Sequence, residues 1–122
     1  MASQQHFPKQ GDLIWIDAEP HAGHEYGGHE PTNNIRRPML VTSSESYNRI
    51  TGMVAGFPIT SQIPSDFPTA LKIKTAKIQG YAVLSSLLGY DFDARHGEVV
   101  AQVDRVTRMN ALAAVQTIFA IY

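Results

Sequence analysis

Cysteine is absent from this chain of 122 residues. The chain can therefore form neither disulfide bonds nor a thiolate metal site, and we expect a protein of the reducing cytoplasm. An excess of one charge is also lacking, because 10 Lys and Arg against 11 Asp and Glu give a formal net charge of −1. No global field attracts a polyanion, so any contact with nucleic acid must come from a local patch.

Long hydrophobic runs are missing as well. No segment approaches the ~20 apolar residues that span a membrane, and the N-terminus MASQQHFPKQGD has no apolar core of a signal peptide. Hydrophobic residues nevertheless make up 43% of the chain, which is enough for one buried core. We therefore predict a flexible N-terminus at 1–10 and a single domain at 11–122.

Short β-rich runs dominate the chain. Strands are predicted at Asp12–Asp17, Met39–Ser43, Met53–Pro58, Thr69–Lys74, Tyr81–Leu88 and Glu98–Val103. SESYNRITG (44–52) and GYDFDARHG (89–97) look like turns between them. From Thr107, a plausible N-cap, apolar residues recur every three or four positions, which predicts a closing helix. The pattern indicates a mainly β fold with a C-terminal helix packed across a curled antiparallel sheet or small barrel.

Residues 21–36 form a long loop without an apolar period, and loops of this length inside compact domains are often functional. Its possible metal ligands are His21, His24, Glu25, His29 and Glu30. They lie among glycines and not on a helix that would fix their spacing, so we predict no metal and no cofactor. A serine hydrolase is equally weakly supported, because no GxSxG motif occurs; the serines involved would be Ser43, Ser44 and Ser46.

Arg37 and Thr60 form a stronger candidate pair. If 38–43 and 53–58 pair as antiparallel strands, Arg37 enters the first strand at the end where the second strand leaves, close to Thr60 and Ser61. A guanidinium beside hydroxyl groups is a good clamp for a phosphate or an oxyanion. The alternative is that Arg37 pairs with an acid such as Glu25 and that Thr60 only caps a turn. Spacing alone favours this second interpretation.

The order of several short motifs resembles the toxin family that includes MazF, PemK and Kid. The matching segments are GDLIWIDAEP (11–20), GHE (23–25), RP (37–38), S (43), YN (47–48), TG (51–52) and PITSQ (58–62). Each motif is weak alone, but their ordered combination is specific. The resemblance continues more loosely through Gly80–Arg95 and into the terminal helix. It implies a small SH3-like barrel of the PemK/CcdB type with a C-terminal helix.

The resemblance also implies a function. Members of this family are toxins of type II toxin–antitoxin modules, homodimers that cut single-stranded RNA sequence-selectively and without metal. The ribose 2′-OH attacks its neighbouring phosphate, which leaves a 2′,3′-cyclic phosphate and a 5′-OH. Arg37 and Thr60 match the catalytic arginine and threonine of the family. His24 and Glu25 match positions in members that carry GHE, and we assign to them the 2′ proton.

A local patch would suffice for RNA. Its predicted residues are Arg36, Arg49, Ser61, Gln62 and Tyr47, with Lys72, Lys74 and Lys77 as further cations. Trp15 and Tyr26 could also stack on bases, although Trp15 fits the core or a dimer interface better. By the resemblance, the same patch would receive the acidic tail of a cognate MazE- or PemI-like antitoxin, which folds on binding.

Two departures from the family pattern stand out. Ser85-Ser86 replaces a common Asp-Gln pair, and about seven extra residues lie within His29–Ile35. Two alternatives therefore stay open: a toxin that poisons a protein partner, as the CcdB group does, and a degenerate copy that only binds antitoxin.

Overall fold

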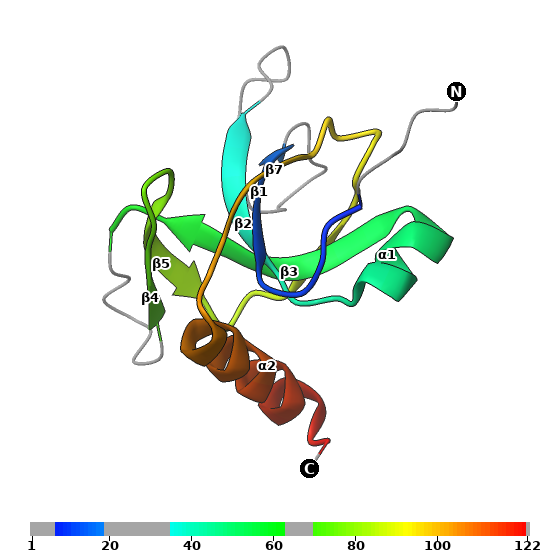
Figure 1. The fold of residues 1–122 in the computed structure, drawn as a ribbon. Coiled ribbons are helices and arrows are strands. Elements are labelled where there is room, and N and C mark those ends of the chain that lie inside the picture. Colours follow the sequence, from blue (N-terminus) through cyan, green and yellow to red (C-terminus); the bar gives the residue numbers. More distant parts are fainter. Residues whose placement is uncertain (1–6, 19–34, 63–69, 122) are drawn as a thin grey trace, which may run out of the picture.

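The fold is one antiparallel sheet of seven strands with two helices, seen in a computed structural model that describes residues 7–18, 35–62 and 70–121 (Figure 1). The elements in chain order are β1 (Asp12–Asp17), β2 (Arg36–Val41), α1 (Glu45–Thr51), β3 (Met53–Thr60), β4 (Ala70–Lys74), β5 (Gln79–Val83), β6 (Leu88–Asp91), β7 (Glu98–Gln102) and α2 (Arg105–Phe119). The strand order is β4-β5-β3-β2-β1-β7, and β6 pairs with β3. The predicted mainly β fold with a C-terminal helix is confirmed.

Strand β3 holds the two halves of the sheet together. Its first half pairs with β6 and β2, and its last residues pair with β5, which in turn pairs with β4. The sheet curls at this change of partner, so Figure 1 shows β4 and β5 at one end of β3 and α1 at the other. The last residue of β1, Asp17, the first residue of β2, Arg36, and the last residue of β3, Thr60, therefore lie at strand ends remote from α1.

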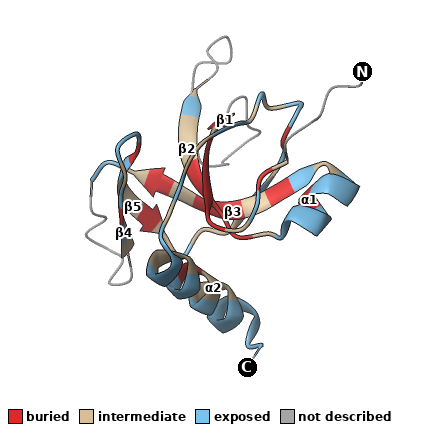
Figure 2. Ribbon diagram, in the orientation of Figure 1, coloured by how far each residue is buried: buried red, intermediate tan, exposed pale blue. Residues whose placement is uncertain are grey.

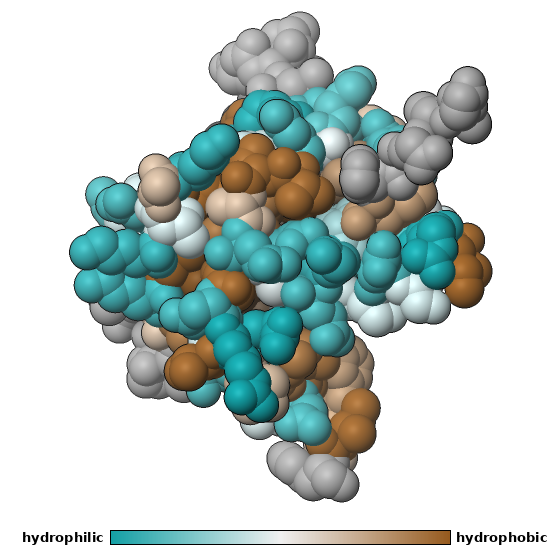
Figure 3. Space-filling model, viewed as in Figure 1, coloured by the Kyte–Doolittle hydropathy of each residue, from teal (hydrophilic) through white to brown (hydrophobic). Residues whose placement is uncertain are grey.

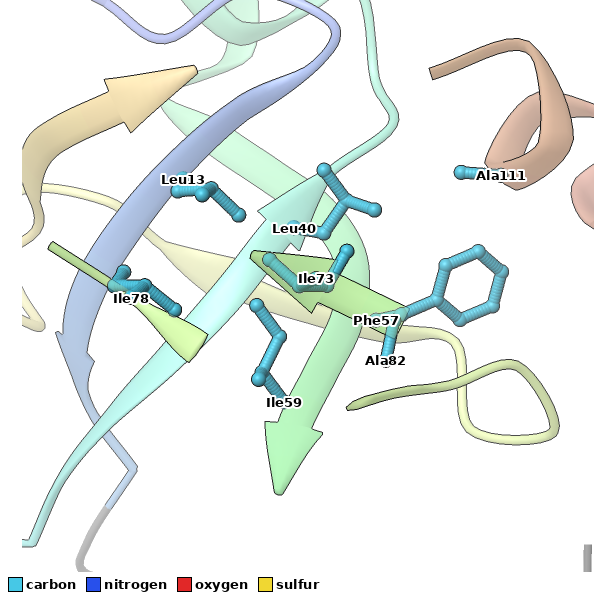
Figure 4. Close-up of a cluster of buried hydrophobic side chains, with 8 residues drawn as sticks. All are labelled: Leu13, Leu40, Phe57, Ile59, Ile73, Ile78, Ala82 and Ala111. Carbon is cyan, nitrogen blue, oxygen red and sulfur yellow. The ribbon is translucent and has the colours of Figure 1, made fainter. Parts of the chain in front are cut away.

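Two apolar clusters lie on opposite faces of the strands, because successive side chains alternate. The first holds Leu13, Leu40, Phe57, Ile59, Ile73, Ile78, Ala82 and Ala111, and α2 contributes through Ala111 (Figure 4). The second holds Ile14, Ile16, Met39, Val41, Val54 and Phe92. Most of the outer side of α2 remains exposed (Figure 2). Met109 and Phe119, whose spacing predicted this helix, are among its exposed residues.

The predicted turn at 44–52 is wrong, because these residues form helix α1. Ser44 caps it by accepting the Tyr47 N–H, and Gly52 ends it in the left-handed conformation with φ of 76°. Asn48 is fully buried and its side-chain amide donates to Pro8 O at 2.7 Å and to Ser43 O. The Ser, Tyr-Asn and Thr-Gly motifs thus shape this helix.

Other boundaries also differ from prediction. β2 spans Arg36–Val41 instead of Met39–Ser43, so Arg36 belongs to a strand and not to the predicted loop, and β3 runs on to Thr60. The strand predicted at Tyr81–Leu88 is two strands, β5 and β6, separated by a turn at 84–87, so β6 takes the first residues of the predicted turn 89–97. The N-cap of α2 is Asp104 and not Thr107, whose N–H donates to the Asp104 carboxylate at 2.8 Å. This hydrogen bond lowers the pKa of Asp104. Asp is among the preferred N-cap residues, and the helix begins at Asp104 and not at Thr107 three residues later.

The N-terminal prediction was too wide. Of the ten residues expected to be flexible, Phe7 to Gln10 belong to the fold: the Phe7 ring lies 6.2 Å from that of Phe92, and Pro8 O accepts the Asn48 hydrogen bond. Residues 1–6 lie outside the described part of the chain. Among the helices that the structure describes, neither is long and apolar enough to cross a membrane.

Candidate functional site

Arg37 lies at the start of β2, opposite Ile16 of β1. Arg37 as a whole is half-buried, and its Nε atom is buried. The side chain lines a small, mostly apolar depression together with Ile16, Ala18, Pro38, Met39, Pro58, Leu88 and Tyr90. A half-buried guanidinium with mostly apolar neighbours could bind a phosphate in partly desolvated conditions.

Thr60 ends β3 and pairs with Tyr81 of β5. Its Oγ1 accepts the Gln62 N–H at 3.4 Å, so the turn-capping alternative describes one real contact. Accepting this bond leaves the hydroxyl proton available for donation. Gly80 lets β5 approach: a Cβ added there would lie 2.4 Å from Thr60 O, and the φ of 157° is one that side chains rarely adopt.

Arg37 and Thr60 share one face of the sheet. The β2–β3 ladder pairs Leu40 with Phe57 and ends with Met39 and Pro58, so Arg37 and Thr60 each lie two residues beyond its last pair. Alternation then puts Arg37 with Met39, and Thr60 with Pro58, on the face of the second apolar cluster. Both residues are only half-buried. The sequence prediction that these two side chains converge is therefore compatible with the register and with the exposure of both.

The sequence analysis did not identify Tyr90 as part of the site, and it did not predict that Arg95 contacts Tyr90. The Arg95 guanidinium lies 5.5 Å from the centre of the Tyr90 ring, and Tyr90 lines the same depression as Arg37. Arg95 is also tied to β1, since its carbonyl accepts the Asp17 N–H at 2.9 Å. A second cation thus lies beside the depression. The only signal in the sequence that pointed to it was the looser family resemblance through Gly80–Arg95, which ends at this arginine.

Arg36 is engaged elsewhere. Its Nη1 donates to Asp17 Oδ1 at 2.9 Å and to His96 O at 2.7 Å, and its Nη2 lies 3.6 Å from Glu98. Asp17 is buried, and its other oxygen lies 2.8 Å from His96 Nδ1. The hydrogen bond from Arg36, followed by that from His96, lowers the pKa of Asp17. Because alternate residues point to opposite faces, Arg36 leaves the sheet on the side away from Arg37.

The other predicted RNA-binding residues fall in two places. Ser61 and Gln62 are exposed directly after Thr60. Tyr47 and Arg49 lie on α1, which follows the far end of β2, so the structure does not bring them to Arg37 (Figure 1). Arg49 pairs instead with Glu45 at 3.7 Å. Trp15 packs against the first apolar cluster, as predicted.

His24 and Glu25, and the other possible metal ligands His21, His29 and Glu30, lie outside the described residues, as does Tyr26. Within the described ranges, no group of three or more His, Asp or Glu could hold a metal ion. Ser85 and Ser86, which replace the expected Asp-Gln pair, lie in the turn between β5 and β6, and Ser85 is exposed.

The comparison with known proteins decides the family. Residues 9–119 match the family described as PemK-like, MazF-like toxin of type II toxin–antitoxin system. This chain belongs to that family. The match spans all the described strands and α2, so the family predicted from the ordered motifs is confirmed.

Individual relatives agree with the assignment to the PemK/MazF family. The endoribonuclease toxin MazF of Escherichia coli K12 is 32% identical over 91 residues, 75% of each chain. Its name confirms the predicted activity class at the level of the family. The crystal structure of MazF from Deinococcus radiodurans has a TM-score of 0.79 and 25% identity, covering 96% of this chain and 100% of that one. A MazE–MazF structure from the same organism has a TM-score of 0.77, with 25% identity and coverage of 97% and 100%.

Proposed function

We propose that this PemK/MazF-type toxin is a metal-independent endoribonuclease that cuts single-stranded RNA at the face shared by Arg37 and Thr60. The observation that carries the proposal is that both residues are half-buried and lie two residues beyond the last β2–β3 pair, on the face that alternation assigns to Met39 and Pro58. In the reaction the 2′ oxygen forms a bond to phosphorus while the bond from phosphorus to the 5′ oxygen breaks. The 2′ proton goes to a base and the 5′ oxygen gains a proton, so a 2′,3′-cyclic phosphate and a 5′-OH result.

Arg37 would stabilise the negative charge that grows on the phosphorane. A guanidinium has a pKa above ~12 and is a poor base, but it is a strong bidentate donor to phosphate oxygens. The apolar side chains around it, such as Pro38 and Pro58, reduce competition from water and strengthen the interaction. Thr60 would donate its hydroxyl proton to a phosphate oxygen while its lone pair keeps the bond from Gln62 N.

The 2′ proton needs an acceptor, and the chain lacks the aspartate of the Asp-Gln pair. Ser85 and Ser86 have no carboxylate to replace it. We assign this task to His24 together with Glu25, because an imidazole titrates near neutral pH.

Two partners follow from the family. The MazE–MazF complexes of Deinococcus radiodurans motivate a cognate antitoxin whose acidic segment competes with RNA for Arg37 and Arg95. A second copy of this chain is the other partner. The apolar residues that α2 exposes are Val106, Met109, Ile118 and Phe119, and Figure 3 shows apolar side chains at the surface of its C-terminal half. Burial of this face would give a homodimer that works in the cytoplasm, where its RNA is.

The decisive experiment is an RNA digest in EDTA with end mapping of the products. We expect fragments with cyclic phosphate and 5′-OH ends, produced by the wild type and not by Arg37→Ala. Thr60→Ala should lower the single-turnover rate by about 10²-fold, as loss of one transition-state donor commonly does. Intact RNA with the wild type would reject the proposal and favour a toxin that binds a protein. An unchanged rate in Thr60→Ala would remove Thr60 from the mechanism.

A further inference from the structure

A row of side chains runs across the sheet from Thr60. Tyr81 of β5 pairs with Thr60 on one side and with Lys72 of β4 on the other. Paired residues of antiparallel strands project from the same face, so all three side chains point the same way. Neighbouring strands lie about 4.8 Å apart, which puts Lys72 about 10 Å from Thr60 along the row. The row therefore crosses β3, β5 and β4, while Arg37 of β2 lies two residues beyond the last β2–β3 pair, Met39 and Pro58.

The face that carries this row is the outer one of the β4–β5 half. Ile59, Ala82 and Ile73 alternate with the row residues and are buried in the first apolar cluster. Lys72 is exposed and Tyr81 is half-buried, so part of the Tyr81 residue stays accessible. The structure places no acid in this row between Thr60 and Lys72.

We propose that Tyr81 and Lys72 form a nucleotide subsite next to the cleavage site. The Tyr81 ring would stack on the base of a nucleotide adjacent to the scissile phosphate, and Lys72 would contact the phosphate beyond it. Proteins that bind single strands combine these two elements, an aromatic platform and a cation that follows the backbone. The proposal rests on the proposed function, since it takes Thr60 as the neighbour of the scissile phosphate.

The chain provides a matched control. Lys77, which the sequence suggested as a further cation for RNA, is also exposed and lies only five residues after Lys72, but it sits in the turn between β4 and β5 and not in the row, so the structure gives it no part in the subsite. If RNA were attracted to any exposed lysine, substitutions at Lys72 and Lys77 would weaken binding equally. If Lys72 belongs to a subsite, only the substitution at Lys72 should weaken binding.

The test measures binding of the full-length protein to a short single-stranded RNA with 2′-O-methyl groups, which cannot be cleaved by 2′-OH attack. Kd is determined over a range of KCl concentrations. Lys72→Gln should weaken binding and lower the slope of log Kd against log salt by about 1, whereas Lys77→Gln should leave the slope unchanged. Tyr81→Ala should raise Kd by about 5- to 100-fold with little change in slope, and Tyr81→Phe should bind like the wild type.

The outcomes separate this proposal from the proposed function. Equal effects of Lys72→Gln and Lys77→Gln, or an unchanged Kd in Tyr81→Ala, would overturn the subsite even if the wild type cuts RNA. The expected pattern would support it even if the wild type fails to cut. If Tyr81→Ala lowers thermal stability and Tyr81→Phe restores stability without restoring affinity, the ring serves the sheet only and the subsite is rejected.

Discussion

Asp17 and Arg36 face each other at the last pair of the β1–β2 ladder, and their side chains meet at 2.9 Å. The carboxylate is buried and the guanidinium is about one-third exposed. The pair fastens the beginning of β2, immediately before Arg37. Since β2 pairs with β3 only from Met39 onward, this end of the strand depends on its contacts with β1 and with the 91–97 turn.

The first prediction concerns acid stability. The pKa of Asp17 is below its ordinary value of 3.8 because Arg36 and then His96 hydrogen-bond to it. The unfolded chain therefore binds this proton more readily than the native one, so the stabilisation is complete above about pH 4–5 and is lost as pH falls through the lowered pKa. Urea unfolding of wild type and Asp17→Asn should differ by about 1–3 kcal/mol at neutral pH and converge towards about pH 2. A constant difference across this range would contradict the assignment.

The second prediction separates Arg36 from Arg37. Arg36 already has a buried carboxylate partner, so Arg36→Gln should lower the melting temperature and the cleavage rate but leave the salt dependence of RNA binding nearly unchanged. Arg37→Gln should reduce that slope by about 1. Fluorescence anisotropy with uncleavable RNA measures both. If Arg36→Gln reduces the slope as much as Arg37→Gln does, Arg36 is a phosphate ligand after all, as the sequence suggested.

The third prediction uses Gly80 to move Thr60 without altering it. The Cβ of Gly80→Ala would lie 2.4 Å from Thr60 O, so β3 and β5 must shift apart. We expect a loss of about 1–3 kcal/mol in unfolding free energy and a cleavage rate at least about 10-fold lower, because misplacing a catalytic group is costly. Gly89→Ala is the control, since its Cβ would be 3.9 Å from its nearest neighbour, Val54 O. Equal rates for the two variants would show that Thr60 need not be held in place.

The fourth prediction concerns Asn48, whose buried amide joins α1 to the N-terminal residues. Asn48→Ala leaves Pro8 O without this donor and should cost about 1–3 kcal/mol of unfolding free energy. The exposed Asn110→Ala on α2 should change stability by less than about 0.5 kcal/mol. Because α1 is remote from Arg37 along β2, the cleavage rate of folded Asn48→Ala should match the wild type. A rate loss at full occupancy of the native state would link α1 to the site.

The fifth prediction concerns self-association. Met109 and Phe119 are half or more exposed on α2, and a glutamate at either place would have to be desolvated in a dimer. Phe119→Glu should shift the sedimentation of the protein from dimer to monomer at concentrations where the wild type is dimeric. Gln116→Glu, at an exposed polar position of the same helix, serves as the control for added charge. A wild type that is monomeric at all concentrations would remove the homodimer from the proposal.

The pattern of apolar residues along the chain predicted the strands and the helix that bury one apolar face. β1, β3, β4 and α2 were found because alternation or helical period is visible within a few residues. α1 was missed because its one fully buried side chain is the polar Asn48, which a hydrophobic pattern does not register. The break between β5 and β6 was missed because the turn, Leu84-Ser85-Ser86-Leu87, holds no Gly, Pro, Asn or Asp and has a leucine at each end.

The sequence predicted only the part of the candidate site that lies on two strands adjacent in the chain. Arg37 and Thr60 follow from the pairing of two strands close in the chain. The engagement of Arg36 combines Asp17, 19 residues earlier, with His96, 60 residues later, so the hairpin alone does not show it. Arg95 and Tyr90 are only five residues apart, but their place beside Arg37 depends on the pairing of β6 with β3 and on the bond from Asp17 N to Arg95 O. The alignment of Lys72 with Thr60 required the registers of β5 with both neighbours.

Strand β3 changes partner after Pro58, from β2 on one side to β5 on the other. Arg37 and Thr60 are therefore supported by different halves of the sheet. If the proposed site is correct, hydrogen exchange of the β5 amides should report on catalytic competence, since local opening there would release Thr60 while Arg37 stays in place. An inhibitor that spread the two halves could then silence this protein without touching either of the proposed phosphate-binding residues.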